Sequence, residues 1–128
     1  MPTSLDTIAE FLSRYGEAVS AGDLAAVTAC WGIPSLVLSD QGALAVGEPA
    51  QVGKFFAGSV EWYRSQGVVR TTPDIQGVEP LSRRLFSVDV KWNGLDQSGA
   101  VTSIEHSRYL LGVEEDDSLC IRVAIALS

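Results

Sequence analysis

The chain has 128 residues, 46% of them hydrophobic, and a formal net charge of −7 at pH 7. This length suits one domain, residues 1–128, with enough apolar side chains for a buried core. The negative charge argues against binding to nucleic acid or to an anionic membrane surface, because like charges repel. The sequence has no apolar run long enough to span a bilayer and no basic signal region, so we expect a cytoplasmic protein.

Metal and cofactor chemistry has little support in the composition. The single histidine and the two distant cysteines, Cys30 and Cys120, form no ligand cluster in the sequence. We therefore expect no metal site and no cofactor. The cysteines are interpreted as buried thiols in a reducing compartment, with a disulfide as the less favoured alternative.

The chain begins with two helical patterns. Apolar residues at spacings of three and four predict a helix over about 4–20. Gly22 is suited to end this helix, and Asp23 is suited to cap a second helix over 24–31. Tyr15 belongs to the inward stripe of the first helix, so we expect it inside the protein. A core tyrosine with one hydrogen-bond partner is the simplest interpretation.

A hairpin and a third helix follow. Pro34 ends the second helix, and residues 35–39 and 43–46 predict two short strands joined by a turn at Asp40. A third helix is predicted over about 49–66, with proline at its first position. This helix contains four aromatic residues, which would suit the wall of a pocket and a packed core equally. They are Phe55, Phe56, Trp62 and Tyr63.

From residue 68 onwards the pattern is that of β-strands. Four are predicted, over residues 68–78, 84–93, 101–111 and 119–127. Helices mixed with a hairpin and followed by long strands predict an α+β fold. We expect a curved antiparallel sheet wrapped around three helices.

The third of these four strands contains a carboxylate in an unusual place. Strict alternation puts Glu105 on the same face as Ser103, Ser107 and Tyr109, and puts His106 on the opposite face. Neither face is cleanly polar, so both are expected to be partly covered. A carboxylate among apolar neighbours is costly unless it is hydrogen-bonded or protonated. Glu105 is therefore the first candidate for a functional residue, and His106 is more typical of an outer surface.

Three stretches of the sequence resemble a known superfamily. They are RYGEAVSAGDLAAVTACW (14–31), KWNG (91–94) and IEHSRY (104–109), together with the hairpin and the Gly47-Glu48 helix start. They resemble the nuclear transport factor 2-like superfamily, which includes ketosteroid isomerases, scytalone dehydratase and SnoaL-type cyclases. The resemblance covers almost the whole chain and implies a cone-shaped α+β fold with an internal apolar pocket. It is specific for the fold and weak for function, because the superfamily hosts many activities.

The closest comparison by residue is with the ketosteroid isomerases. It implies that Tyr15 corresponds to their oxyanion-hole tyrosine and Glu105 to their oxyanion-hole acid. Their general base falls on Ser39 here, and a serine cannot lift a proton from carbon. Asp40, one residue along, would enter the pocket only through a slip or bulge in the strand. Steroid isomerisation itself is therefore not expected.

The resemblance implies a small-molecule isomerase, dehydratase or cyclase acting on a hydrophobic carbonyl or hydroxyl compound. The catalytic candidates for such an enzyme are Tyr15, Glu105 and Asp40. The expected substrate contacts are Trp31, Ser39, Phe55, Phe56, Tyr63, Trp92 and Tyr109. Two alternatives stay open: a pocket that binds a ligand without turnover, and a filled structural domain. In each case we expect a homodimer through the outer face of the sheet, because that face carries apolar side chains.

Overall fold

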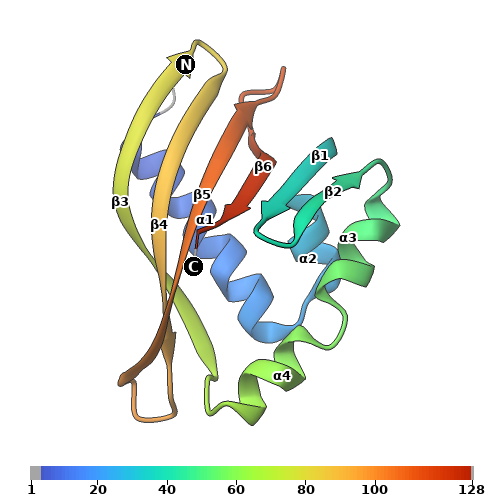
Figure 1. The fold of residues 1–128 in the computed structure, drawn as a ribbon. Coiled ribbons are helices and arrows are strands. Elements are labelled where there is room, and N and C mark those ends of the chain that lie inside the picture. Colours follow the sequence, from blue (N-terminus) through green and yellow to red (C-terminus); the bar gives the residue numbers. More distant parts are fainter. Residues whose placement is uncertain (1–3, 128) are drawn as a thin grey trace.

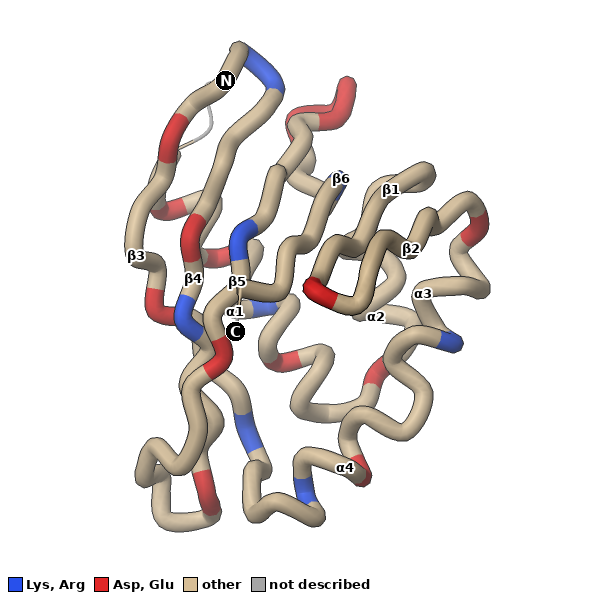
Figure 2. The backbone as a smooth tube through the Cα atoms, viewed as in Figure 1, with Lys and Arg blue, Asp and Glu red and all other residues tan. Residues whose placement is uncertain are grey.

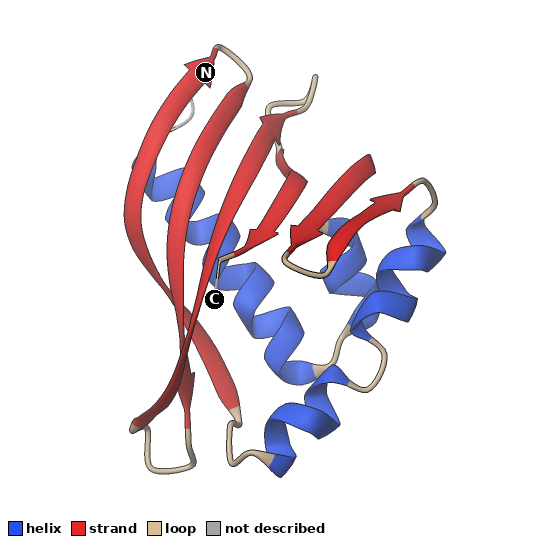
Figure 3. Ribbon diagram, in the orientation of Figure 1, coloured by secondary structure: helices blue, strands red, loops and turns tan. Residues whose placement is uncertain are grey.

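A six-stranded sheet curves around helix α1 in the computed structural model, which describes residues 4–127 (Figure 1). The helices are α1 (Leu5–Ala21), α2 (Leu24–Ala29), α3 (Pro49–Phe56) and α4 (Ser59–Ser65). The strands are β1 (Trp31–Ser39), β2 (Gly42–Val46), β3 (Arg70–Ser82), β4 (Leu85–Leu95), β5 (Val101–Val113) and β6 (Leu119–Ala126). This is the expected α+β cone fold, with all helices on the concave side of the sheet (Figure 3).

The strand order is β2-β1-β6-β5-β4-β3. Every neighbouring pair is antiparallel except β1 and β6, which run parallel. The expected antiparallel sheet therefore contains one parallel pair. The strands β3, β4 and β5 are long and strongly curved, and β6 separates them from the short hairpin of β1 and β2 (Figure 1).

Helix α1 lies against the concave face because one side of it is apolar. Ser4 caps the helix by accepting a hydrogen bond from the backbone N–H of Thr7 at 3.1 Å. Gly22, with φ of 68°, ends it in a left-handed conformation that glycine adopts without strain. The inward side is buried and includes Ile8, Phe11, Leu12, Tyr15, Gly16 and Ala18. The helix thus forms the floor of the cone and places Tyr15 inside it, as expected.

The second and third helices differ from the sequence prediction. Helix α2 ends at Ala29, and Trp31 already belongs to β1, where it pairs with Ile121 of β6. Strand pairing therefore replaces the last helical turn that local pattern predicted. Pro34 lies within β1 at a shift in the pairing register, where no ladder hydrogen bond is required of it. The third helix is split by Gly58, whose φ is 82°, into α3 and α4.

Charge is distributed unevenly over the sheet. Strands β1 and β2 contain no charged residue, whereas β3, β4 and β5 each carry both acidic and basic residues (Figure 2). On the outer face, Arg108 of β5 pairs with Asp89 of β4 at 2.5 Å. No helix among residues 4–127 is long and apolar enough to cross a membrane.

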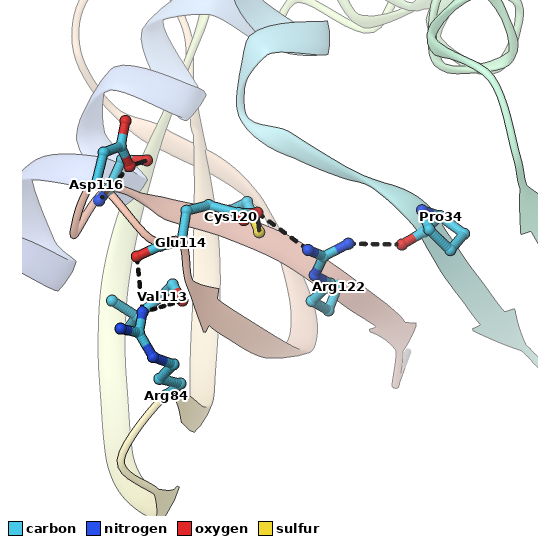
Figure 4. A network of polar contacts seen from close by, with 8 residues as sticks. Pro34, Arg84, Val113, Glu114, Asp116, Cys120 and Arg122 are labelled. Atoms are coloured by element: carbon cyan, nitrogen blue, oxygen red, sulfur yellow. Dashed lines mark hydrogen bonds and ion pairs between the residues drawn. The ribbon is translucent and has the colours of Figure 1, made fainter.

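A polar network joins β1, β5 and β6 at one end of the sheet (Figure 4). Arg122 donates to the carbonyl of Pro34 at 3.0 Å and to the Glu114 carboxylate at 3.1 Å. Cys120 donates its thiol hydrogen to Glu114 at 2.8 Å, and burial together with this bond raises the pKa of Cys120 to about 11. A thiol with that pKa is a poor nucleophile at neutral pH, so this network is structural. Cys30 and Cys120 are both free, as expected.

Candidate functional site

A cavity of about 330 Å³ lies between the helices and the concave face of the sheet. Its wall is mainly aromatic and aliphatic, with a few polar groups. The residues that line it include Tyr15, Trp31, Phe56, Tyr63, Glu105 and Tyr109. Phe55 also lines the cavity and is 48% exposed, so the cavity opens to solvent beside α3. The cone is therefore not filled by its aromatic residues, which disfavours a purely structural domain.

Glu105 projects from β5 into this cavity and is held by Tyr63 of α4. The Tyr63 hydroxyl donates to the carboxylate, at 3.0 Å from Oε1 and 3.2 Å from Oε2. Burial, reinforced by the nearby Glu105, raises the pKa of Tyr63, so the tyrosine remains a protonated donor. Alternation along β5 thus placed Glu105 correctly. Its hydrogen-bond partner is Tyr63, a residue to which the isomerase comparison gave no role beside Tyr15 and Glu105.

Tyr15 lies in the middle of an aromatic cluster on the cavity floor. Its ring centroid is 6.0 Å from Trp92, 6.3 Å from Tyr109 and 6.3 Å from Phe56, in edge-to-face arrangements. Burial raises the pKa of Tyr15 well above its ordinary value, and the nearby Tyr109 adds to the effect. Tyr15 is therefore a neutral hydroxyl that lines the cavity.

Trp92 and Tyr109 are fixed to each other on the sheet side. The indole Nε1 of Trp92 donates to the Tyr109 hydroxyl at 2.8 Å, in a buried position. Burial raises the pKa of Tyr109 to about 12. These two residues form a rigid polar contact inside an apolar wall, and both line the cavity as expected.

The two remaining aromatic candidates also line the cavity. Trp31 stands at the start of β1, 6% exposed, with its ring 6.4 Å from Phe56. Its indole Nε1 is buried, and the Tyr15 hydroxyl lies close enough for a hydrogen bond with Trp31 to oppose, in part, the rise in the Tyr15 pKa that burial causes.

Three residues considered from the sequence lie outside the cavity. Ser39 and Asp40 are at the β1–β2 turn, where the Ser39 hydroxyl donates to the side chain of Gln41 at 3.0 Å and Asp40 is exposed. This corrects their assignment to the site: β1 is regular at this end, so no bulge turns Asp40 inward. His106 faces the outer side of β5, as alternation predicts. Among residues 4–127, Glu105 is therefore the single carboxylate that lines the cavity.

Comparison with known proteins agrees with this geometry. Residues 6–127 match the family described as NTF2-like protein (DUF6841). The chain belongs to this NTF2-like family. No relative was found among proteins with curated descriptions.

Solved structures share the fold of this NTF2-like chain at low sequence identity. A ketosteroid isomerase-like protein from Erwinia carotovora atroseptica is 18% identical, with a TM-score of 0.69, over 97% of this chain and 96% of its own. An NTF-2 like protein from Shewanella oneidensis is 17% identical, with a TM-score of 0.70, over 94% and 96% respectively. A Nostoc punctiforme domain with a cystatin-like fold is 13% identical, with a TM-score of 0.73, over 96% and 77%. At such identities these likenesses show the fold alone.

Some lining residues of this NTF2-like cavity were not anticipated. Val37 of β1 and Ala124 of β6 are paired neighbours whose side of the sheet faces the cavity. Alternation along each strand could have grouped them, but only if the parallel pairing of β1 with β6 were known. No group of three or more metal-ligating side chains occurs within residues 4–127.

Proposed function

We propose that this protein binds a small, largely apolar carbonyl or hydroxyl compound in the cavity and that Glu105 moves a proton on it. The observation that carries this proposal is one carboxylate held by a tyrosine inside an otherwise apolar cavity of about 330 Å³. Ligand cavities of this kind have apolar walls and few polar groups. The volume suits a compound of two or three fused rings.

The chemistry suited to this arrangement is proton transfer without a cofactor. Glu105 accepts a proton from the carbon beside the bound carbonyl, which leaves an enolate. Where this enolate is conjugated with a carbon–carbon double bond, the same carboxyl group returns the proton to the far carbon, and the net result is a shifted double bond with unchanged composition. Loss of a β-hydroxyl group from the enolate, which leaves as water with the proton from Glu105, would make the reaction a dehydration. Attack by the enolate carbon on a second carbonyl, with the proton from Glu105 passing to the new alkoxide, would make it a cyclisation.

The experiment follows hydrogen exchange on a probe ketone, 2-tetralone, in deuterated buffer by nuclear magnetic resonance. Wild-type protein should speed exchange at the carbons beside the carbonyl above the buffer rate. Glu105→Gln, which retains an acceptor for Tyr63, should lower the rate at least tenfold because general acid–base catalysis contributes about 10²–10⁴ in rate. Glu61→Gln, an exposed residue of α4, is the matched control and should leave the rate unchanged.

A second candidate, ligand binding without turnover, is favoured by one observation. Within the described part of the chain, residues 4–127, no second carboxylate or histidine lines the cavity to assist Glu105. Quenching of tryptophan fluorescence by 2-tetralone, with exchange no faster than in buffer, would support this second candidate and contradict catalysis. The cytoplasmic location expected from the sequence remains a prediction.

A further inference from the structure

The carboxylate of Glu105 has no positively charged partner among residues 4–127. Tyr63 donates to both of its oxygens, and the ion pairs of this range join other residues. No lysine, arginine or histidine of the described range lines the cavity. Glu105 is half-buried, and a charge that is partly removed from water is costly unless an opposite charge compensates it. A ligand that carries a positive charge would supply this compensation.

Aromatic rings surround the carboxylate. Trp92 of β4 is the cross-strand partner of Glu105, and Tyr109 follows two residues later on the same face of β5. The ring centroids of Trp92 and Tyr109 are 6.4 Å apart, and each lies close to Tyr15, at 6.0 and 6.3 Å respectively. Tyr63 reaches Glu105 from α4 through its hydroxyl group. The aromatic cage, as we call Tyr15, Tyr63, Trp92 and Tyr109, lines the cavity together with Glu105.

The negative charge of Glu105 acts on two rings of the aromatic cage. Burial is the main cause of the raised pKa of Tyr63 and of Tyr109, and the charge of Glu105 contributes to both. The carboxylate and these rings are therefore neighbours. The face of an aromatic ring attracts cations, and cages of such rings recognise ammonium groups. The net charge of −7 also favours the approach of a cation.

We propose that the cavity binds hydrophobic amines in their protonated form, with the ammonium group between Glu105 and the aromatic cage. This inference goes beyond the proposed function, because it concerns the charge of the ligand and requires no proton transfer to or from carbon. The apolar remainder of the cavity, which measures about 330 Å³, accommodates the hydrocarbon part. An amine bound there takes the place of the carbonyl compound and prevents Glu105 from accepting its proton.

Three probes of similar shape test this inference on the wild-type protein by titration calorimetry at pH 7. They are 2-naphthylmethylamine, which is protonated at this pH, the neutral 2-naphthalenemethanol and the anionic 2-naphthoate. The amine should bind at least tenfold more tightly than the alcohol, because only the cation compensates Glu105 and interacts with the ring faces. The anion should bind more weakly than the alcohol, because the carboxylate of Glu105 repels it.

Substitution of the carboxylate shows whether Glu105 is the source of this preference. Glu105→Gln should weaken the amine at least tenfold and change the alcohol by less than twofold. The unchanged alcohol also shows that the variant is folded. Glu61→Gln removes the same charge from the exposed side of α4 and is the matched control. It should leave the affinity of both probes unchanged.

Two substitutions of Tyr63 separate its ring from its hydroxyl group. Tyr63→Phe retains the ring face, so the amine should bind within twofold of its wild-type affinity. Tyr63→Leu removes the ring and should weaken the amine at least threefold more than the alcohol. Equal weakening of the two probes by Tyr63→Leu would contradict a contact between the cation and this ring.

The outcomes distinguish this inference from the proposed function. An alcohol that binds as tightly as the amine, or equal weakening of both by Glu105→Gln, would overturn the amine site while the cavity still binds ligands. Tight binding of the amine without accelerated exchange of 2-tetralone would support the amine site and contradict catalysis. If none of the three probes binds at its solubility limit, the ligand cavity fails and the amine site fails with it.

Discussion

The hydroxyl of Tyr63 is the protein group that stabilises Glu105 inside the cavity. Its two contacts with the carboxylate, 3.0 and 3.2 Å, join α4 to β5. Glu105 is half-buried, so loss of this donor leaves a partly desolvated carboxylate without its hydrogen bond.

Tyr63→Phe should therefore lower the free energy of unfolding by about 1 kcal/mol. Urea unfolding at pH 7 measures the change. The control is Trp62→Phe, since Trp62 is 59% exposed and should contribute much less. Equal stability of Tyr63→Phe and the wild type would show that the hydrogen bond contributes nothing to the fold.

The three tyrosines should resist ionisation together. Tyr15, Tyr63 and Tyr109 are all the tyrosines of the chain, and burial raises the pKa of each, to about 12 for Tyr109. A folded pKa above the unfolded value of about 10 means that the folded state retains the proton more tightly. The resulting stability is complete below about pH 10 and decreases as the pH rises from there towards 12.

Absorbance of tyrosinate, followed while the pH is raised, measures this effect. We expect almost no tyrosinate at pH 10 and a steep, cooperative increase at higher pH, coincident with the loss of circular dichroism. A gradual titration centred on pH 10 in a protein that remains folded would contradict the burial of these hydroxyl groups.

At the scale of elements, the closeness of α1 to the sheet depends on Gly16. A Cβ atom at this position would lie 2.8 Å from the ring of Trp92 and 3.0 Å from the carbonyl of Thr71. Gly53 of α3 is the opposite case, because a Cβ atom there would meet no atom within 4 Å.

The same substitution should therefore have opposite signs at these two helical positions. Gly16→Ala should lower the free energy of unfolding by about 1–2 kcal/mol, because overpacking outweighs the better helix propensity of alanine. Gly53→Ala should raise it by about 0.5–1 kcal/mol. Urea unfolding of both variants tests the pair. A stabilising Gly16→Ala would mean that α1 does not approach the sheet so closely.

At the scale of the whole molecule, the outer face of the central strands is the surface that lacks a partner in one chain. On this outer face, which is opposite to the cavity, cross-strand pairing places Leu36 and Leu110 on either side of Val123. Leu38 and Ile104 extend the same face, and Ile104 is 58% exposed. We propose that a second copy of the chain covers this convex patch, because apolar side chains gathered on one face mark an interaction surface.

Light scattering at micromolar concentration should then give twice the mass of one chain. Leu110→Glu places a charge in the middle of the convex patch and should yield the mass of a monomer with native circular dichroism. Leu81→Glu is the control, because Leu81 is 49% exposed at the end of β3, and it should leave the mass unchanged. A wild-type monomer would end this proposal.

Local periodicity was enough to predict several features of this protein. The inward stripe of α1 predicted a buried Tyr15, and alternation along β5 predicted Glu105 and Tyr109 on one face. These predictions are confirmed because a residue's face on a helix or strand depends on spacing alone. The family resemblance supplied the cone, which local pattern does not specify.

Contacts between side chains that are distant in the sequence could not be predicted in this way, because they depend on how the elements pack. Glu105 bonds to Tyr63, 42 residues away, because the break at Gly58 directs α4 towards β5. Trp31 entered a strand because β6 was available for pairing, and its indole faces the cavity for that reason. Asp40 stayed in solvent because β1 and β2 pair regularly up to the turn. Whether the cone is filled or hollow depends on the volumes that distant segments enclose, and these arise only when the whole chain packs.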